Sequence, residues 1–504
     1  MGIERLPWEI LHLILVLLMP QDLGRVAQVN KGMNNFLSTN DKLFRDMIGL
    51  IYGKPRERDD VSYSKVLKDA TRLACICASE DVGMKKREVK FVQEASFAFL
   101  AIASASGRAD CQKILPESRI SEFMQTIFST LDLMPCAAHA KDNLDLFMCN
   151  SSLFQHMLVD RAVDRPDDDE LQSRQRSAKL HALYGCPIRM YHHRAQEAPV
   201  RRKLRVYPHA CAKVYDMRNY TEHNHWGPFK NDGSLTVNWE MIEAVLVTLA
   251  ENIEKRGFNT YPANVFWRVP FGGSFPYSYV GAKTKNPFPG NLQDPYGVTG
   301  TYSRIVCFLD YGDFSAFNFP GNGREPSPSL DAEEATRLIV MSLKVTKITK
   351  PGPDDGQDRP IVHYQGTTRW LENGDASACP IVRGTVRTTK EGEIRWTSSS
   401  IFNGEERWKS ESIQVGGIQS ARGTVGTWFD AEHDPHGPVG PTASWKIMDR
   451  VIDGGAGSNN LQDLNTSDDD NENENEEDAM DVEDDGNLLQ VNLATIDAGF
   501  TYST

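Results

Sequence analysis

The sequence lacks an apolar run long enough to cross a membrane. Its longest, Ile10–Met19, spans ten residues, whereas a transmembrane helix needs roughly twenty. A secretory signal does not fit this run either, because Arg5 is the only basic residue before it and Glu4 offsets that charge. Pro20-Gln21-Asp22 follows at the point where a signal would carry small residues for cleavage. We therefore expect no membrane partner.

The sequence also lacks an excess of basic residues. Its 55 Lys and Arg oppose 69 Asp and Glu, a formal net charge of −14. Residues 451–504 hold 15 of the acidic residues and no basic one, which leaves 54 acidic against 55 basic residues in 1–450. A nearly neutral body offers no basic footprint for phosphates, so we expect no nucleic-acid partner. The acidic, low-complexity segment 451–504 predicts a disordered tail.

Cysteine is present but forms no pattern of pairs. The nine cysteines are an odd number scattered singly along the chain, with Cys75 and Cys77 as the only close pair. This usage excludes a disulfide framework and indicates a reduced intracellular compartment, cytoplasmic and/or nuclear. The chain also lacks a Cys-x-x-Cys knuckle, and we expect no metal and no other cofactor. One His/Cys-rich segment is therefore interpreted as ordinary surface and core residues: His181, His192, His193, His209, Cys211, His223 and His225.

Sequence motifs for catalysis are missing as well. The chain has no Gly-rich phosphate cradle, no serine nucleophile elbow and no metalloprotease motif. An acid–histidine cluster, Asp430–His436, has the residue types that acid–base chemistry needs. It lies among prolines and glycines, where such side chains more often satisfy turn backbone groups. The sequence therefore predicts a non-catalytic protein.

What the chain does have is an apolar N-terminus patterned as short helices. Leu11, Ile14, Leu15 and Leu18 form one helical stripe, and a second stripe lies opposite. Pro20 ends this helix. Three further helices follow, with Asp22, Asn30 and Asp41 placed as their N-caps. Fewer than sixty residues cannot bury apolar side chains on so many faces, so a surface is left for a partner. The alternative is that these helices pack onto the chain's own downstream domain.

The N-terminal pattern resembles the F-box, across the whole length of that module. The residues that carry the resemblance are Leu6-Pro7, Glu9, Ile10, Leu11, Ile14, Leu15, Leu18, Pro20, Asp22, Leu23, Val26, Val29, Phe36 and Leu43-Phe44-Arg45. Met33 and Phe44 stand where the family usually has Trp. The resemblance implies docking on a Skp-family adaptor, and through it on a cullin. The implied anchor residues are Leu6, Pro7, Ile10, Leu11, Ile14, Leu15, Leu18, Pro20, Leu23, Val26 and Phe44, some of which must instead hold the module's own core.

The expected F-box domain covers residues 1–53. After it, the pattern predicts a helical region over 60–257 and a β-rich domain over 258–450, the proposed place of substrate recognition. The clearest helix spans Val237–Phe258, with Asn238 as N-cap. Ala212–Val245 resembles a block shared by fungal F-box proteins. The expected fold class is α+β, with the β-rich part a mostly antiparallel barrel or sandwich without helices between strands. The expected strands are Ser303–Tyr311, Leu338–Ile348, Ile361–Trp370, Ile381–Thr388, Glu393–Ser400, Ser412–Gly416, Arg422–Phe429 and Ala443–Met448.

The function that the resemblance implies is that of a substrate-receptor subunit of an SCF-type (Skp-cullin-F-box) ubiquitin ligase. The F-box would dock on the adaptor, and the remainder would present a target protein for ubiquitination. Two alternatives stay open: a ligand-binding or catalytic β-barrel that carries the F-box as a regulatory handle, and a plain scaffold.

Overall fold

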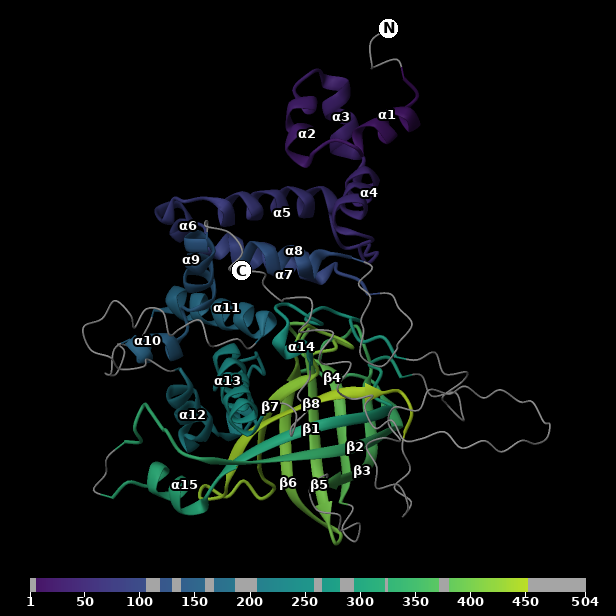
Figure 1. Ribbon diagram of the computed structural model, residues 1–504. Helices are drawn as coiled ribbons and strands as arrows, with labels where there is room; N and C mark the ends of the chain where they lie inside the picture. The colour runs from purple at the N-terminus through teal and green to yellow at the C-terminus, as the bar shows by residue number, and fades with distance from the viewer. Residues whose placement is uncertain are drawn as a thin grey trace, which may run out of the picture. The chain divides into compact units, whose positions relative to one another are not determined.

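Four short helices form the N-terminal part of the chain in the computed structural model (Figure 1): α1 Trp8–Leu15, α2 Pro20–Ala27, α3 Lys31–Thr39 and α4 Asp41–Tyr52. The structure describes residues 6–105, 118–128, 137–158, 167–185, 206–257, 265–281, 294–321, 325–370 and 380–451. The predicted disordered tail (from 452 on), His192 and His193 lie outside these described residues.

The N-caps of these helices were only partly predicted. Asn30 caps α3 as expected and accepts a hydrogen bond from the Met33 amide at 2.8 Å. The predicted cap at Asp22 is wrong, because α2 already begins at Pro20, whose fixed φ suits the first helical position. The cap of α4 is Asn40 rather than Asp41. The Asp41 carboxylate instead accepts hydrogen bonds from two backbone amides at the start of the next helix.

A larger set of helices follows, drawn from violet to teal in Figure 1. They are α5 Tyr63–Ala78, α6 Val82–Arg87, α7 Val89–Ala101, α8 Ile120–Phe128, α9 Ala137–Met148, α10 Ser152–Leu158, α11 Asp168–Tyr184, α12 Tyr207–Tyr215, α13 Trp239–Arg256 and the short α14 Val265–Arg268. The prediction for α13 is confirmed at both ends. Asn238 accepts a hydrogen bond from the Met241 amide, and Gly257 ends the helix with a φ of 84°.

Eight antiparallel strands close into a barrel, which confirms the α+β fold class and selects the barrel over the sandwich. The strands are β1 Gly300–Leu309, β2 Glu334–Thr349, β3 Ile361–Trp370, β4 Ile381–Thr388, β5 Ile394–Phe402, β6 Glu405–Gln414, β7 Thr424–Asp430 and β8 Val439–Met448. Two expectations were wrong. A helix, α15 Tyr311–Asn318, lies between β1 and β2, and β6 begins seven residues before the strand predicted at Ser412–Gly416.

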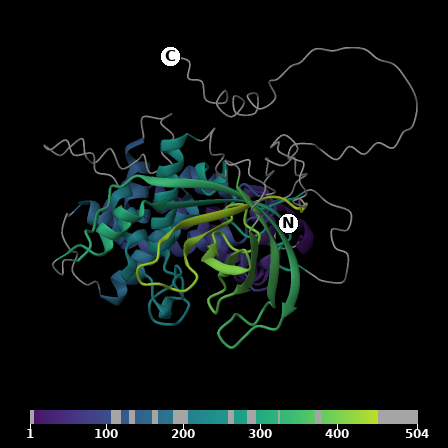
Figure 2. The ribbon, with the colours of Figure 1, turned by 90° about the horizontal axis from the view of Figure 1, so that it is seen from below.

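Helices α12 and α13 lie beside the barrel, whereas α1 to α5 are drawn above it in Figure 1; Figure 2 gives the perpendicular view. α13 packs against β1, β7 and β8. The outward faces of these strands, with Ile305, Val425 and Ala443, belong to the same apolar cluster as the helices. A second cluster, including Tyr302, Tyr364 and Trp396, fills part of the barrel interior.

All the described residues, 6 to 451 with the gaps given above, belong to one compact unit. The domain boundaries expected from the sequence, 1–53, 60–257 and 258–450, therefore stay predictions.

Candidate adaptor-docking surface

Helix α1 has one apolar face buried and another exposed. Leu11 and Leu15 point into the N-terminal helices and are 7% and 2% exposed. On the other side Leu13 is 60% exposed, and Leu17, in the turn that follows α1, is 73% exposed. Because both stripes of this helix are apolar, burying one of them leaves the other in water. The face that carries Leu13 and Leu17 thus has the properties of an unfilled interface.

The predicted anchor residues divide between the module's own core and its surface. Leu11, Leu15, Leu23 and Phe44 are buried, Leu18, Pro20 and Val26 are half-buried, and Leu6, Pro7, Ile10 and Ile14 are exposed. Sequence reasoning did not select six further apolar side chains of these helices and their turns that the structure leaves exposed: Trp8, Leu13, Leu17, Met19, Val29 and Leu50. The second apolar stripe of the predicted helix was the signal for Leu13 and Leu17, although α1 ends at Leu15 and Leu17 lies in the turn after it.

A polar contact fixes α1 on the rest of the helical module. His12 Nε2 lies 3.0 Å from a carboxylate oxygen of Asp46 on α4, and its other ring nitrogen lies 3.4 Å from the Asn40 amide. Phe44, also on α4, is covered by the downstream helix α5, where the Lys68 ammonium lies 5.9 Å from the ring centroid. α1 is therefore held at a set angle with its outer face free of the described residues, whereas Phe44 is packed inside.

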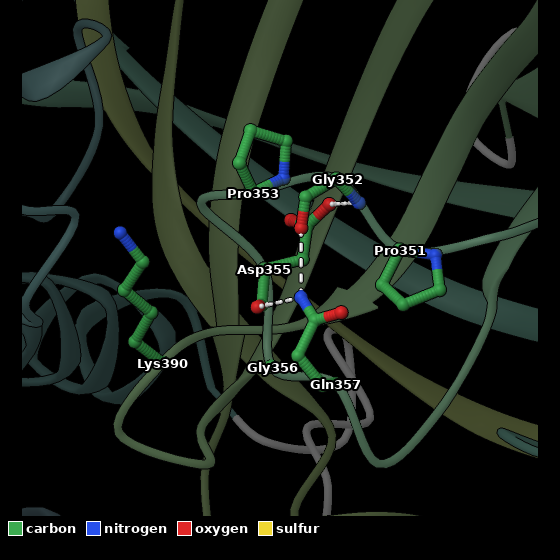
Figure 3. A pocket seen from close by; sticks show the side chains of 7 residues that line it. All are labelled: Pro351, Gly352, Pro353, Asp355, Gly356, Gln357 and Lys390. Atoms are coloured by element: carbon green, nitrogen blue, oxygen red, sulfur yellow. Dashed lines mark hydrogen bonds between the residues drawn. The ribbon is translucent and has the colours of Figure 1, made fainter.

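Two hollows lie elsewhere on the molecule. One, of about 430 Å³, is lined by Pro351, Gly352, Pro353, Asp355, Gly356, Gln357 and Lys390 (Figure 3). Asp355 accepts a hydrogen bond from the Gly352 amide at 2.8 Å, and the Gln357 amide group donates to two backbone carbonyls of the same loop. These polar groups satisfy one another. The hollow is therefore shaped by a loop at the end of the barrel, and the Asp355 and Gln357 side chains hold that loop in place.

The second hollow, of about 260 Å³, is lined by Met217, Arg218, Tyr220, Trp226, Asn318, Phe319, Pro326 and Pro435. Four of these residues come from the block Ala212–Val245. His225 and Trp226 both have left-handed backbone conformations, with φ of 54° and 58°. The Asn224 side chain supports this loop through bonds with the Thr221 and Trp226 amides. A left-handed conformation costs free energy in a residue other than glycine, so two in succession persist only where contacts from the surrounding structure hold the backbone.

The acid–histidine cluster borders this second hollow. The His433 ring stacks on Trp226 with centroids 5.0 Å apart, and its Nδ1 lies 3.3 Å from Glu222. The Asp430 carboxylate accepts hydrogen bonds from the Glu432 and Asp434 amides, as expected of a turn. Among the residues that the structure describes, no group of three or more His, Cys, Asp or Glu side chains is placed to hold a metal ion.

Comparison with known proteins identifies one part of the chain. A family model described as F-box-like matches residues 3–48, the segment that forms α1 to α4 up to Ile48. No curated protein and no solved structure matches the chain. Within the described ranges, no helix is both long and apolar enough to span a membrane. The N-terminal helices are thus an F-box-like domain, which supports an F-box protein and, at the family level, binding to a Skp-type adaptor and so to a cullin.

Proposed function

We propose that this chain is a substrate-receptor subunit of an SCF-type ubiquitin ligase. The observation that carries the proposal is the F-box-like domain with an apolar face of α1 left uncovered by the described residues. Burying a Leu or Ile side chain contributes roughly 1.5–3 kcal/mol. A patch that contains Leu13, Leu17 and Ile10 therefore has a strong tendency to bind an apolar partner surface, and the adaptor is the partner that the family implies.

The proposed contribution to ubiquitination is proximity rather than chemistry. A receptor that holds a target beside a ubiquitin-charged enzyme makes the encounter of lysine and thioester effectively intramolecular. The large remainder of the chain, over 60–257 and 258–450, is proposed to hold the target. No residue of this chain needs to react, which agrees with the non-catalytic character of F-box proteins in general.

Co-purification with a Skp-family adaptor tests the proposal. Leu11 and Leu15 are unsuitable targets for charge substitution, because both are buried and the variants would unfold the module. The sharper variant is Ile10→Asp with Leu13→Asp, at side chains that are 44% and 60% exposed. We expect this double variant to keep its melting temperature and to lose the adaptor and the cullin.

A matched control is Ile381→Asp, which places the same charge on a barrel side chain that is 40% exposed. This control should retain the adaptor. Equal recovery of the adaptor with the wild-type chain and the folded double variant would contradict the proposal.

A further inference from the structure

Arg304 is a charged side chain inside the barrel. It lies on β1, and its neighbour on the same inward face, Tyr302, belongs to the interior apolar cluster. Only 8% of Arg304 is exposed. A buried charge is costly unless an opposite charge or a full set of hydrogen-bond acceptors compensates it. The partners of this guanidinium therefore decide whether it has a structural role.

The described residues compensate little of this charge. Arg304 Nε donates to Thr442 Oγ1 at 3.0 Å, and Thr442 in turn donates to the Ile305 carbonyl. No carboxylate of the described chain forms an ion pair with Arg304. Burial lowers the pKa of Arg304 to about 10, and nearby Tyr364 only partly opposes that shift. The Tyr364 hydroxyl donates to the Thr397 carbonyl at 2.8 Å, and within the described residues it forms no hydrogen bond with Arg304.

A second buried arginine of the same barrel forms a complete ion pair and serves as a comparison. Arg395, on the outward face of β5, is 7% exposed and makes two hydrogen bonds to Glu411, of 2.8 and 2.7 Å. Both charges of that pair are thus compensated within the fold. Arg304 is buried to the same degree, but its two terminal amino groups have no acceptor among the residues described.

The inward surface near Arg304 is built from small and polar residues. Strand alternation places Gly384, Ser398, Ser410 and Thr442 on the inward face, and the Ser398 and Ser410 hydroxyls lie 2.6 Å apart. Ser398, Ser400 and Val306 are only half-buried, so solvent reaches this side of the interior. An eight-stranded barrel is wide enough to hold one small ligand when its inward side chains are short.

We propose that the barrel interior binds a carboxylate, which pairs with the two terminal amino groups of Arg304. The planar guanidinium matches a carboxylate with two parallel hydrogen bonds. One negative charge also balances the single charge of Arg304, whereas a phosphate dianion would leave a net charge buried. Trp408 and Trp428, which meet edge to face at 5.3 Å on inward positions, supply apolar contacts beside it.

Two sources share this chemistry: a small carboxylic acid and the C-terminal carboxylate of a polypeptide. The second source would make the barrel the site that reads a target, and it rests on the proposed function. The carboxylate site itself does not.

Binding to the purified full-length chain tests the inference with four probes. They are octanoate, inorganic phosphate, a random hexapeptide pool with free C-termini, and the same pool amidated. Arg304→Met is the variant, because it keeps the length of the side chain and removes the charge. We expect octanoate or the free-acid pool to bind about tenfold or more tightly to the wild type than to Arg304→Met, since hydrogen bonds to charged groups have that magnitude.

Each outcome has a defined meaning. Preference for the free-acid pool over the amidated pool supports a polypeptide terminus, and binding of octanoate alone supports a small acid. Three results would overturn the inference. They are no binding of either octanoate or the free-acid pool, equal binding of these probes to the wild type and to Arg304→Met, and binding of phosphate as tight as that of octanoate.

Two controls separate folding and function from binding. Arg383→Met removes an outward, exposed arginine of the same barrel and should leave binding unchanged. Without ligand, Arg304→Met should melt at or above the wild-type temperature, because it removes an uncompensated buried charge. A large fall in that temperature would show a structural pairing and refute the inference. Adaptor recovery should not change in Arg304→Met, so failure here is distinguishable from failure of the proposed function.

Discussion

Tyr215 donates its hydroxyl hydrogen to Glu334 at 2.5 Å in the interface between the helices and the barrel. Tyr215 is fully buried and Glu334 is 2% exposed. Tyr207 and Asn252 donate to the same carboxylate. One acidic side chain at the start of β2 thus joins α12 and α13 to the barrel, and desolvation by burial raises its pKa in spite of the three donors.

Tyr215→Phe is expected to lower the free energy of unfolding by about 1.5–3 kcal/mol at neutral pH, the range for a hydrogen bond to a charged group. The loss should depend on pH. Because the pKa of Glu334 is raised in the folded state, its contribution to stability is full below its unfolded pKa and is lost as pH rises through the folded value. Removing a donor raises that pKa further, so the difference between variant and wild type should shrink in acid.

Urea unfolding of both chains between pH 4 and neutrality measures this difference. Tyr302→Phe is the matched control, because Tyr302 donates to the backbone carbonyls of Gly297 and Val298 and to no carboxylate. Its cost should be independent of pH. A constant cost for Tyr215→Phe would show that Glu334 does not titrate as a buried, hydrogen-bonded acid.

The buried pair Arg395–Glu411 should be sensitive to removal of one partner. Arg395→Met leaves Glu411 buried without its counter-charge, and we expect a loss of about 3–5 kcal/mol. The double variant Arg395→Met with Glu411→Leu should recover most of that loss, because no uncompensated charge is left. Arg383→Met, which breaks the exposed pair with Glu406, should cost less than about 1 kcal/mol. Chemical denaturation of the wild type, Arg395→Met, Glu411→Leu and the double variant completes the cycle. A double effect equal to the sum of the two single effects would contradict the coupling.

The sequence predicted elements whose local signals agree. Helix α13 has an apolar pattern, an Asn cap and a terminal Gly, and β3 and β4 were predicted with their observed bounds. Strand β6 was misplaced because its first half, with Glu405 and Lys409, is polar. Glu411 is nevertheless buried, because Arg395 pairs with it and the loop at Gly227 packs against it. A Cβ added at Gly227 would lie 2.6 Å from the Glu411 Cβ. Partners this distant along the chain give no local signal.

The candidate docking site shows the same limit. Both stripes of α1 are apolar, so periodicity alone does not tell which one faces the core. The position of α4 decides it, through the contact of His12 with Asp46. The anchor set predicted from the resemblance therefore contained core and surface residues together.

Leu15→Ala and Leu13→Ala should separate the two faces of α1. Leu15 is 2% exposed, so its truncation leaves a cavity and should cost about 2–5 kcal/mol. Leu13 is 60% exposed, and its truncation should change stability by less than about 0.5 kcal/mol. Hydrogen exchange of residues 8–52 measures the change in stability of both variants, and adaptor affinity measures the contribution of Leu13 to docking. Faster exchange in both variants would show that Leu13 also packs within the module.

Two glycine substitutions should have opposite effects on stability. Gly24 lies inside α2, and a Cβ added there meets nothing within 4 Å. Gly24→Ala should therefore stabilise the N-terminal helices by about 0.5–1 kcal/mol, because alanine loses less backbone entropy in a helix. Gly185 ends α11 with a φ of 108°, and its Cβ would lie 2.5 Å from Arg422 Nη1 and 2.8 Å from the Trp267 carbonyl.

Gly185→Ala should consequently destabilise the chain by at least about 1–3 kcal/mol, from backbone strain together with the clash. Gly392→Ala isolates the strain, because Gly392 has a φ of 86° but open space around its Cβ. Thermal unfolding of the three variants should rank Gly24→Ala above wild type, Gly392→Ala below it and Gly185→Ala lowest. If Gly185→Ala and Gly392→Ala lost equal stability, the contact with Arg422 would not be a rigid part of the junction between α11 and the barrel.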